Sequence, residues 1–183
     1  RGDCLSIKGL SRDLKQFYDV TEEDVYKENI EPYSLEFNNN AKEHCKSITF
    51  LKIEIDDIPS SYHGSLENYF VDLNINKNNF FTDVSNYISY ETGQPTHCYD
   101  ISLVETPLRL DYLGESKEFE TLLDKKIILH KNSLVFFDKN DEVINLAGIV
   151  GGMTTSCKKN TKSVIVECAH FDPEIILGKA LKY

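Results

Sequence analysis

Residues 83–100 have the sequence DVSNYISYETGQPTHCYD and predict a helix that ends abruptly. Its apolar side chains recur at three- and four-residue spacing, as on the buried face of a helix, at Val84, Tyr87 and Ile88. Thr82 or Asp83 occupies the position expected of an N-cap residue. Gly93 follows, and glycine favours the left-handed conformation that ends many helices. We therefore expect the helix to stop just before Gly93.

Pro95 sends the chain in a new direction after this helix. Proline lacks the backbone N–H that a further helical turn needs, so residues 96–98 leave on a different path. That change of direction brings Ser85 and Asn86, on the helix, within reach of the imidazole of His97. These polar side chains are therefore expected to line a small pocket.

The composition is that of a folded globular domain. The 183 residues are 40% hydrophobic and 27% charged, which predicts a sizeable core in one domain or two closely fused subdomains. No apolar run approaches the roughly 20 residues that span a bilayer, and no hydrophobic leader opens the chain, so we expect no membrane partner. Because the sequence does not begin with Met, we expect a fragment of a longer protein.

The net charge limits how the chain could meet nucleic acid. The charge is −10 and the isoelectric point is near 5.0, whereas domains that bind nucleic acid through phosphates alone carry a basic face. We therefore expect any contact with a polynucleotide to involve one of its ends, with other domains holding the rest.

The cysteines predict neither a disulfide framework nor a metal site. There are five, without a Cys-x-x-Cys pair, which is typical of free thiols in a reducing cytoplasm. The His–Cys pairs at residues 44–45 and 97–98 are adjacent rather than spaced as zinc ligands are. We expect a cytoplasmic protein that binds no metal.

The remaining segments predict an α+β fold with a mixed, sandwich-like β core and peripheral helices. Further helices are expected over residues 3–18, capped by Asp3, over 65–73, and from Pro173 onward, capped by Asp172. Apolar patterning predicts strands at residues 48–55, 108–112, 127–129, 134–137, 143–146 and 163–168. The alternation slips at Phe50–Leu51, which predicts a bulge. The polar turn at 138–142 predicts a hairpin.

Residues 146–152, LAGIVGG, allow two interpretations. Glycines let the backbone approach a ligand closely, and they also form tight turns between strands. The segment lacks the Gly-Lys-Ser/Thr of a phosphate-binding loop and the glycine spacing of dinucleotide sites.

Glu167 is a carboxylate in the otherwise apolar strand VIVECAHF. If it is buried it requires a polar partner, because an unpaired buried carboxylate is costly; alternatively, it faces water at a strand edge. Val164, Val166 and Cys168 are expected on one face of this strand, with Ile165 and Glu167 on the other. We find no Ser-His-Asp or Cys-His arrangement that would supply a nucleophile.

Four segments together resemble the bacterial phenylalanyl-tRNA synthetase β subunit, in its B3/B4 editing module. They are RGDCLSIKGLSRDL (1–14), residues 83–100, LAGIVGG, and VIVECAHFDPEII (164–176), in this order and at these separations. The resemblance covers most of residues 1–183 and implies the B3/B4 fold. Within it we distinguish an N-terminal part, 1–79, from residues 80–183, which carry most of the pocket motifs.

The resemblance also implies a function, the hydrolysis of tyrosine wrongly attached to tRNA-Phe. His97 and Glu167 would be the catalytic residues, with Glu167 accepting a hydrogen bond from the phenol and His97 placing the water or the terminal ribose. The substrate-binding residues would be Ser85, Asn86, Ala147 and Gly148. The implied partners are the 3′ end of tRNA-Phe and the synthetase α subunit in an α2β2 assembly. No cofactor is expected in this domain, because ATP and Mg²⁺ belong to the holoenzyme.

Other hypotheses remain open at this point. Residues 74–76 are Asn-Ile-Asn where the family usually has Gly-Ile-Arg, so a cation that could hold phosphate or carboxylate is missing at Asn76. The module could have lost editing and kept a structural or tRNA-positioning role. A free-standing module that acts in trans on mischarged tRNA is a third alternative.

Overall fold

The computed structural model describes residues 4–19, 30–31 and 33–183, and its α+β architecture matches the class expected from the sequence. The helices are α1 (Ile7–Leu14), α2 (Gly64–Asp72), α3 (Phe80–Thr92) and α4 (Pro173–Ile176). Short 3₁₀ turns lie at Ile101–Leu103, Met153–Thr155 and Ala180–Lys182. Throughout the described residues, every helix is too short or too polar to span a bilayer.

The described residues form ten strands in three sheets. They are β1 (Phe37–Asn39), β2 (Cys45–Glu54), β3 (His97–Asp100), β4 (Leu108–Tyr112), β5 (Lys117–Glu120), β6 (Lys126–Leu129), β7 (Leu134–Phe137), β8 (Val143–Leu146), β9 (Val150–Gly151) and β10 (Ser163–Phe171). One sheet has the order β1-β4-β7-β8-β9, the second β2-β10-β3, and the third is the β5-β6 hairpin. The expected hairpin between β7 and β8 is confirmed by their antiparallel pairing.

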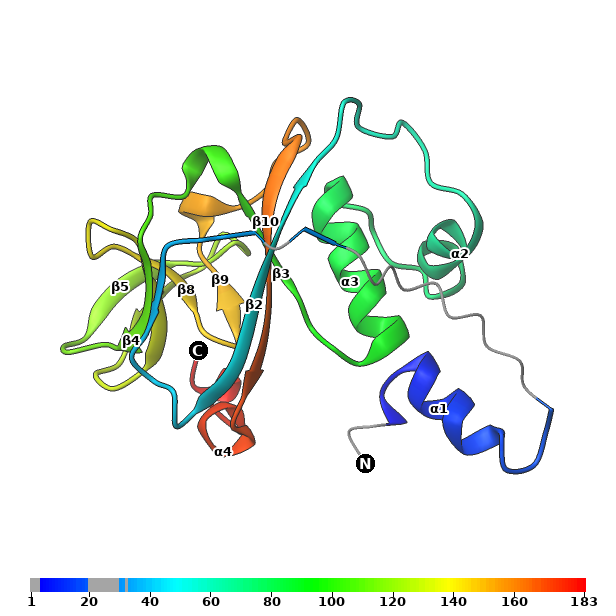
Figure 1. The fold of residues 1–183 in the computed structure, drawn as a ribbon, viewed down its shortest axis with the longest axis horizontal. Coiled ribbons are helices and arrows are strands. Elements are labelled where there is room, and N and C mark those ends of the chain that lie inside the picture. The colour runs from blue at the N-terminus through cyan, green and yellow to red at the C-terminus, as the bar shows by residue number, and fades with distance from the viewer. Residues whose placement is uncertain (1–3, 20–29, 32) are drawn as a thin grey trace.

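The three-stranded sheet is the central layer (Figure 1). Helices α1, α2 and α3 lie on one side of it, and the five-stranded sheet lies on the other. The main core lies between the two sheets and contains Tyr99, Leu108, Phe136 and Ile165. A second core forms around Phe119, Leu129 and Val135, between the five-stranded sheet and the β5-β6 hairpin.

Helix α3 ends as expected but begins earlier. Gly93 follows it in the left-handed conformation, with φ +80°. The expectation of Thr82 or Asp83 as the N-cap is wrong, because the Asn79 side chain accepts the hydrogen bond from the Thr82 N–H. Asp83 is instead fully buried, where it accepts hydrogen bonds from the Tyr62 hydroxyl at 2.7 Å and from a backbone N–H at 2.9 Å.

The bulge expected at Phe50–Leu51 is also wrong. Strand β2 pairs with β10 in unbroken register from Ile48 to Glu54, and the register shifts only near its start, opposite His170 and Phe171. Phe50 and Leu51 point to opposite faces of a sheet that is covered on both faces, so both are half buried. Two-sided burial, not a bulge, accounts for the pattern.

The helix expected over residues 3–18 is shorter, and Ser6 caps it by accepting a hydrogen bond from the Gly9 N–H. Asp3, the expected cap, lies outside the described residues. The cap expected for the last helix is confirmed, because the Asp172 side chain accepts from the Glu174 N–H and Pro173 occupies the first turn.

Candidate functional site

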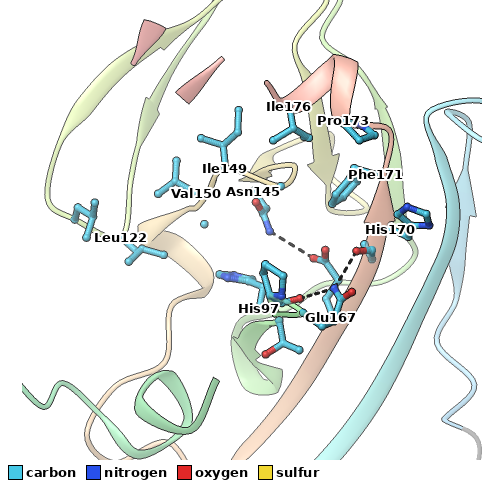
Figure 2. Close-up of a pocket in the computed structure, with 17 residues that line it drawn as sticks. His97, Leu122, Asn145, Ile149, Val150, Glu167, His170, Phe171, Pro173 and Ile176 are labelled. Carbon is cyan, nitrogen blue, oxygen red and sulfur yellow. Dashed lines mark hydrogen bonds between the residues drawn. The ribbon is translucent and has the colours of Figure 1, made fainter. Parts of the chain in front are cut away.

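A pocket of about 580 Å³ opens between the start of β3, the turn from β8 to β9, the end of β10, and α4 (Figure 2). Three of the residues expected at a site from the sequence line it, namely His97, Gly148 and Glu167. Much of the wall is apolar, with Leu122, Leu123, Ile149, Val150, Phe171 and Ile176. The pocket therefore combines a few convergent polar groups with a surface suited to a flat or aliphatic ligand.

Pairing between strands brings His97 and Glu167 together. Strand β10 pairs antiparallel with β3, and His97 lies directly opposite Glu167. Side chains of directly opposite residues share one face of a sheet, here the face toward β8 and the pocket. The alternation expected for β10 agrees with this, since Ile165 packs in the main core on the face that carries Glu167.

Glu167 is a buried carboxylate with polar partners. Its side chain is 5% exposed, and its Oε2 accepts a hydrogen bond from the Tyr99 hydroxyl at 2.6 Å. The Asn145 amide nitrogen lies 3.5 Å from the same oxygen. Burial raises the pKa of Glu167 to about 7, while the hydrogen bond from Tyr99 opposes that rise. The carboxyl group therefore changes charge close to neutral pH.

Tyr99 and Asn145 were not among the residues expected at the site. The Asn145 amide donates to the Tyr99 hydroxyl at 2.7 Å, so the two side chains and Glu167 form one buried hydrogen-bonded group. Asn145 also lines the pocket. One signal was present in the sequence, because Asn145 is a polar residue within the apolar strand VINL, as Glu167 is within VIVECAHF.

His97 is held as a neutral imidazole. Burial lowers its pKa to about 4, and its Nε2 is buried without a hydrogen-bond partner among the described residues. The ring packs edge-to-face on Tyr99, with centroids 4.4 Å apart. It also lies against Gly151, where an added Cβ would come within 2.7 Å of Nε2. The glycine at 151 therefore makes room for the imidazole at the pocket wall.

Gly148 closes the pocket against the C-terminal segment. It adopts φ +69°, which favours glycine, and an added Cβ would lie 2.7 Å from Ile176 Cδ1 and 3.0 Å from Phe171 Cδ2. The interpretation of residues 146–152 as a turn between strands is therefore confirmed, and the segment also borders the cavity, while the close approach of its backbone to a ligand stays a prediction.

A profile of the B3/4 domain family matches residues 55–183. The chain belongs to this family. The resemblance to the phenylalanyl-tRNA synthetase β subunit is thereby confirmed at the level of the domain.

Curated relatives of this B3/4 domain are phenylalanine–tRNA ligase β subunits. The β subunit of Neisseria meningitidis is 27% identical over 190 residues, which include the whole of this chain and 24% of that protein. The β subunit of Idiomarina loihiensis is 31% identical over 188 residues, again the whole chain and 23% of the relative. The chain thus spans about a quarter of the length of these relatives.

A solved structure shares the fold of the B3/4 domain. It is an N-terminal fragment of the phenylalanyl-tRNA synthetase β subunit from Pyrococcus horikoshii, with a TM-score of 0.55 and 13% sequence identity. The alignment covers 96% of this chain and 54% of the other. At this identity the likeness supports the fold alone.

Three residues expected to bind substrate do not line the pocket of this B3/4 domain. Ser85 is buried under Thr96, to whose carbonyl its hydroxyl donates at 2.8 Å. Asn86 is the next residue of α3, about 100° around the helix, and it is exposed to solvent. Ala147 is buried in the main core. The expectation that Asn86 lies on the pocket wall is therefore wrong, and Ser85 supports the segment that leads into His97.

The site offers hydrogen-bonding groups but no evident nucleophile. Burial raises the pKa of Cys98 to about 12, and this thiol donates to the Phe81 carbonyl of α3 rather than facing the pocket. Among the described residues, no group of three or more His, Cys, Asp or Glu side chains could hold a metal ion. That the domain needs no cofactor stays a prediction.

Proposed function

We propose that this chain is the editing module of a phenylalanine–tRNA ligase β subunit and that its pocket hydrolyses tyrosyl-tRNA-Phe. The observation that carries this proposal is Glu167, a hydrogen-bond acceptor buried at the wall of a largely apolar pocket. An aromatic ring suits the apolar wall, and a phenol hydroxyl suits the carboxylate. Tyrosine differs from phenylalanine by that hydroxyl alone.

Selectivity follows from the chemistry of one buried acceptor. A hydrophobic synthetic site rejects an added hydroxyl only weakly, whereas a site built to hydrogen-bond the hydroxyl rejects the analogue that lacks it by as much as ~10⁴–10⁵-fold. Glu167 fulfils this requirement for the tyrosyl group. Phenylalanyl-tRNA would bring no second donor to the carboxylate, which keeps only its hydrogen bond from Tyr99, and would be spared.

Hydrolysis in this proposal uses an oriented water. The neutral His97 lines the pocket, and its buried Nε2 has no partner among the described residues, so we assign this imidazole the role of holding a water or the terminal ribose hydroxyl of the tRNA in place. Attack on the ester then needs positioning more than a protein nucleophile, and positioning alone can supply a large part of the rate. The tRNA hydroxyl next to the ester can assist the water.

Partners and location follow from the same proposal. The domain would receive only the 3′ end of tRNA-Phe, which agrees with its net charge of −10. The α subunit would complete the ligase, and ATP and Mg²⁺ would act in its catalytic domain. The assembly would work in the cytoplasm.

Two observations favour a second candidate, a B3/4 domain that has lost editing and positions tRNA or packs within its subunit. The Tyr99 hydroxyl already occupies one oxygen of Glu167. Position 76, where the family usually has arginine, is an exposed Asn. Activity measurements separate the two candidates, because the geometry of Glu167 is compatible with both.

The test is the substitution of Glu167 in the intact ligase. Glu167→Ala should slow the clearance of tyrosyl-tRNA-Phe roughly five- to 150-fold, since a hydrogen bond to a charged group contributes about 1–3 kcal/mol. Phenylalanine activation should be unchanged, because the synthetic site lies elsewhere. Glu120→Ala, at an exposed position on β5, is the matched control. Equal clearance by parent and Glu167→Ala, with a measurable parent rate, would assign Glu167 a structural role.

A further inference from the structure

Tyr99, Asn145 and Glu167 form a polar group inside the apolar core. Tyr99 is fully buried, and Asn145 and Glu167 are 4% and 5% exposed. Buried polar groups are costly unless each finds a partner, and here the amide donates to the phenol and the phenol donates to the carboxylate. The three side chains come from three strands, β8, β3 and β10, so their arrangement is fixed by the fold.

The hydrogen bonds are distributed unequally over the carboxylate. Oε2 of Glu167 accepts a hydrogen bond from the Tyr99 hydroxyl at 2.6 Å, and the Asn145 amide nitrogen lies 3.5 Å from it. Oε1 accepts no hydrogen bond from the described residues. An ionised carboxylate has about four acceptor positions, so Oε1 keeps its full capacity. Because Glu167 lines the pocket, a hydroxyl that enters can reach this free oxygen.

We propose that Tyr99 and Asn145 are positioning residues, which hold Oε2 of Glu167 so that Oε1 is presented to the hydroxyl of the bound aminoacyl group. This inference rests on the proposed function, and it assigns the specificity of that site to a pair that does not touch the reacting ester. A carboxylate without the anchor could rotate about its last bond and lose the geometry on which discrimination depends. Tyr99 acts on selectivity through Glu167.

The same anchor affects the charge of Glu167. The titratable groups around the carboxyl are Tyr99 and the neutral His97 on β3, Cys45 on β2, and Cys168 on β10 itself, while β8 contributes the uncharged Asn145. His170 on β10 is a further titratable residue that lines the pocket. None of the described residues that line the pocket is Lys or Arg. The phenol is therefore the group that opposes the effect of burial on the pKa of Glu167.

The test is Tyr99→Phe in the intact ligase, which removes one oxygen and keeps the ring that packs on His97. The measured quantity is the ratio of clearance rates for tyrosyl-tRNA-Phe and phenylalanyl-tRNA-Phe between pH 6 and 9. Near pH 7 we expect this ratio to be roughly tenfold lower in Tyr99→Phe than in the parent, as the loss of one charged hydrogen bond implies. We also expect the pH at which the ratio rises to be higher in Tyr99→Phe than in the parent. The ionised carboxylate is the better acceptor, and its pKa rises without the phenol.

Two further variants complete the test. Tyr87→Phe removes a hydroxyl on α3, away from the pocket, and should leave both the ratio and its pH profile unchanged. Asn145→Ala, which removes the other side chain near Oε2, should lower the ratio as Tyr99→Phe does. A lower ratio with an unaltered pH profile in Tyr99→Phe would overturn the positioning role. A higher ratio at every pH would also overturn it, because it would show that the Tyr99 hydroxyl blocks Glu167.

A direct titration keeps the inference independent of activity. In the 183-residue chain with ¹³C-labelled glutamate, the δ-carbon resonance that disappears in Glu167→Gln reports the ionisation of Glu167. We expect its midpoint at higher pH in Tyr99→Phe than in the parent, and equal midpoints would overturn the inference. If the parent ligase clears no tyrosyl-tRNA-Phe, the proposed function fails, while this titration still decides whether Tyr99 controls Glu167.

Discussion

Glu167 and His97 should give the folded chain opposite dependences on pH, which Glu167→Gln would reveal. The folded pKa of Glu167 is raised from 4.5 to about 7, so its contribution to stability is full below pH 4.5 and is lost as pH rises through about 7. The folded pKa of His97 is lowered from 6.5 to about 4, so its contribution is full above pH 6.5 and is lost as pH falls through about 4.

The two contributions are similar in size. Each shift corresponds to about 3 kcal/mol, since one pKa unit is worth about 1.4 kcal/mol. Between about pH 4.5 and 6.5 their slopes oppose one another, so the pair contributes almost no net pH dependence to the parent in this range. Glu167→Gln removes one of the two slopes. Its free energy of unfolding should therefore fall, relative to the parent, by about 3 kcal/mol as pH is lowered from 6.5 to 4.5.

The assay is urea unfolding of the 183-residue chain, followed by circular dichroism at a series of pH values. His97→Gln is the reciprocal variant, and its stability relative to the parent should fall as pH rises from 4.5 to 7. Glu120→Gln, at an exposed position, controls for the loss of one carboxylate. If the curves for Glu167→Gln and His97→Gln run parallel to the parent curve, neither group has a displaced pKa and the prediction is wrong.

Two other substitutions test the structure around the pocket. Gly151→Ala should displace the His97 ring, because the added Cβ would meet Cε1 and Nε2, and a misplacement of about 1 Å should reduce tyrosyl-tRNA-Phe clearance by as much as ~10²-fold. Gly114→Ala, where nothing lies near the added Cβ, is its control, and an equal loss in both would contradict the reasoning. Asp83→Ala should lower the free energy of unfolding by about 2–3 kcal/mol in urea titrations, since it leaves the hydroxyl of the half-buried Tyr62 and the Asn78 N–H without their acceptor. An unchanged midpoint would show that water satisfies both donors.

Local patterns in the sequence predicted the elements that depend on neighbouring residues. Gly93 after α3 and the alternation of β10 around Glu167 were predicted, because left-handed caps and the two-residue period of strands are encoded over a few positions. The start of α3 was not predicted, because Asp83 accepts a hydrogen bond from Tyr62 instead of capping the helix. Tyr62 lies 21 residues earlier, and no local pattern identifies it as the partner of Asp83.

The site shows the same division between local and long-range information. Glu167 and His97 were predicted at the site because both are polar, titratable side chains. The pairing of β3 with β10 makes them direct neighbours. The partnership of Tyr99 and Asn145 requires three strands to meet, and no spacing in the sequence specifies it. Asn86 was misplaced because a helix turns about 100° per residue, so neighbours such as Ser85 and Asn86 face different surroundings.

In the function proposed above, this pocket recognises the hydroxyl of a tyrosyl group on tRNA-Phe. The most direct measurement compares the initial rates at which the intact ligase hydrolyses tyrosyl-tRNA-Phe and phenylalanyl-tRNA-Phe under identical conditions near pH 8, where Glu167 is largely ionised. We expect rapid hydrolysis of the tyrosyl ester, slow hydrolysis of the phenylalanyl ester, and loss of this difference in Glu167→Gln. Hydrolysis of both esters at the rate seen without enzyme would contradict this expectation.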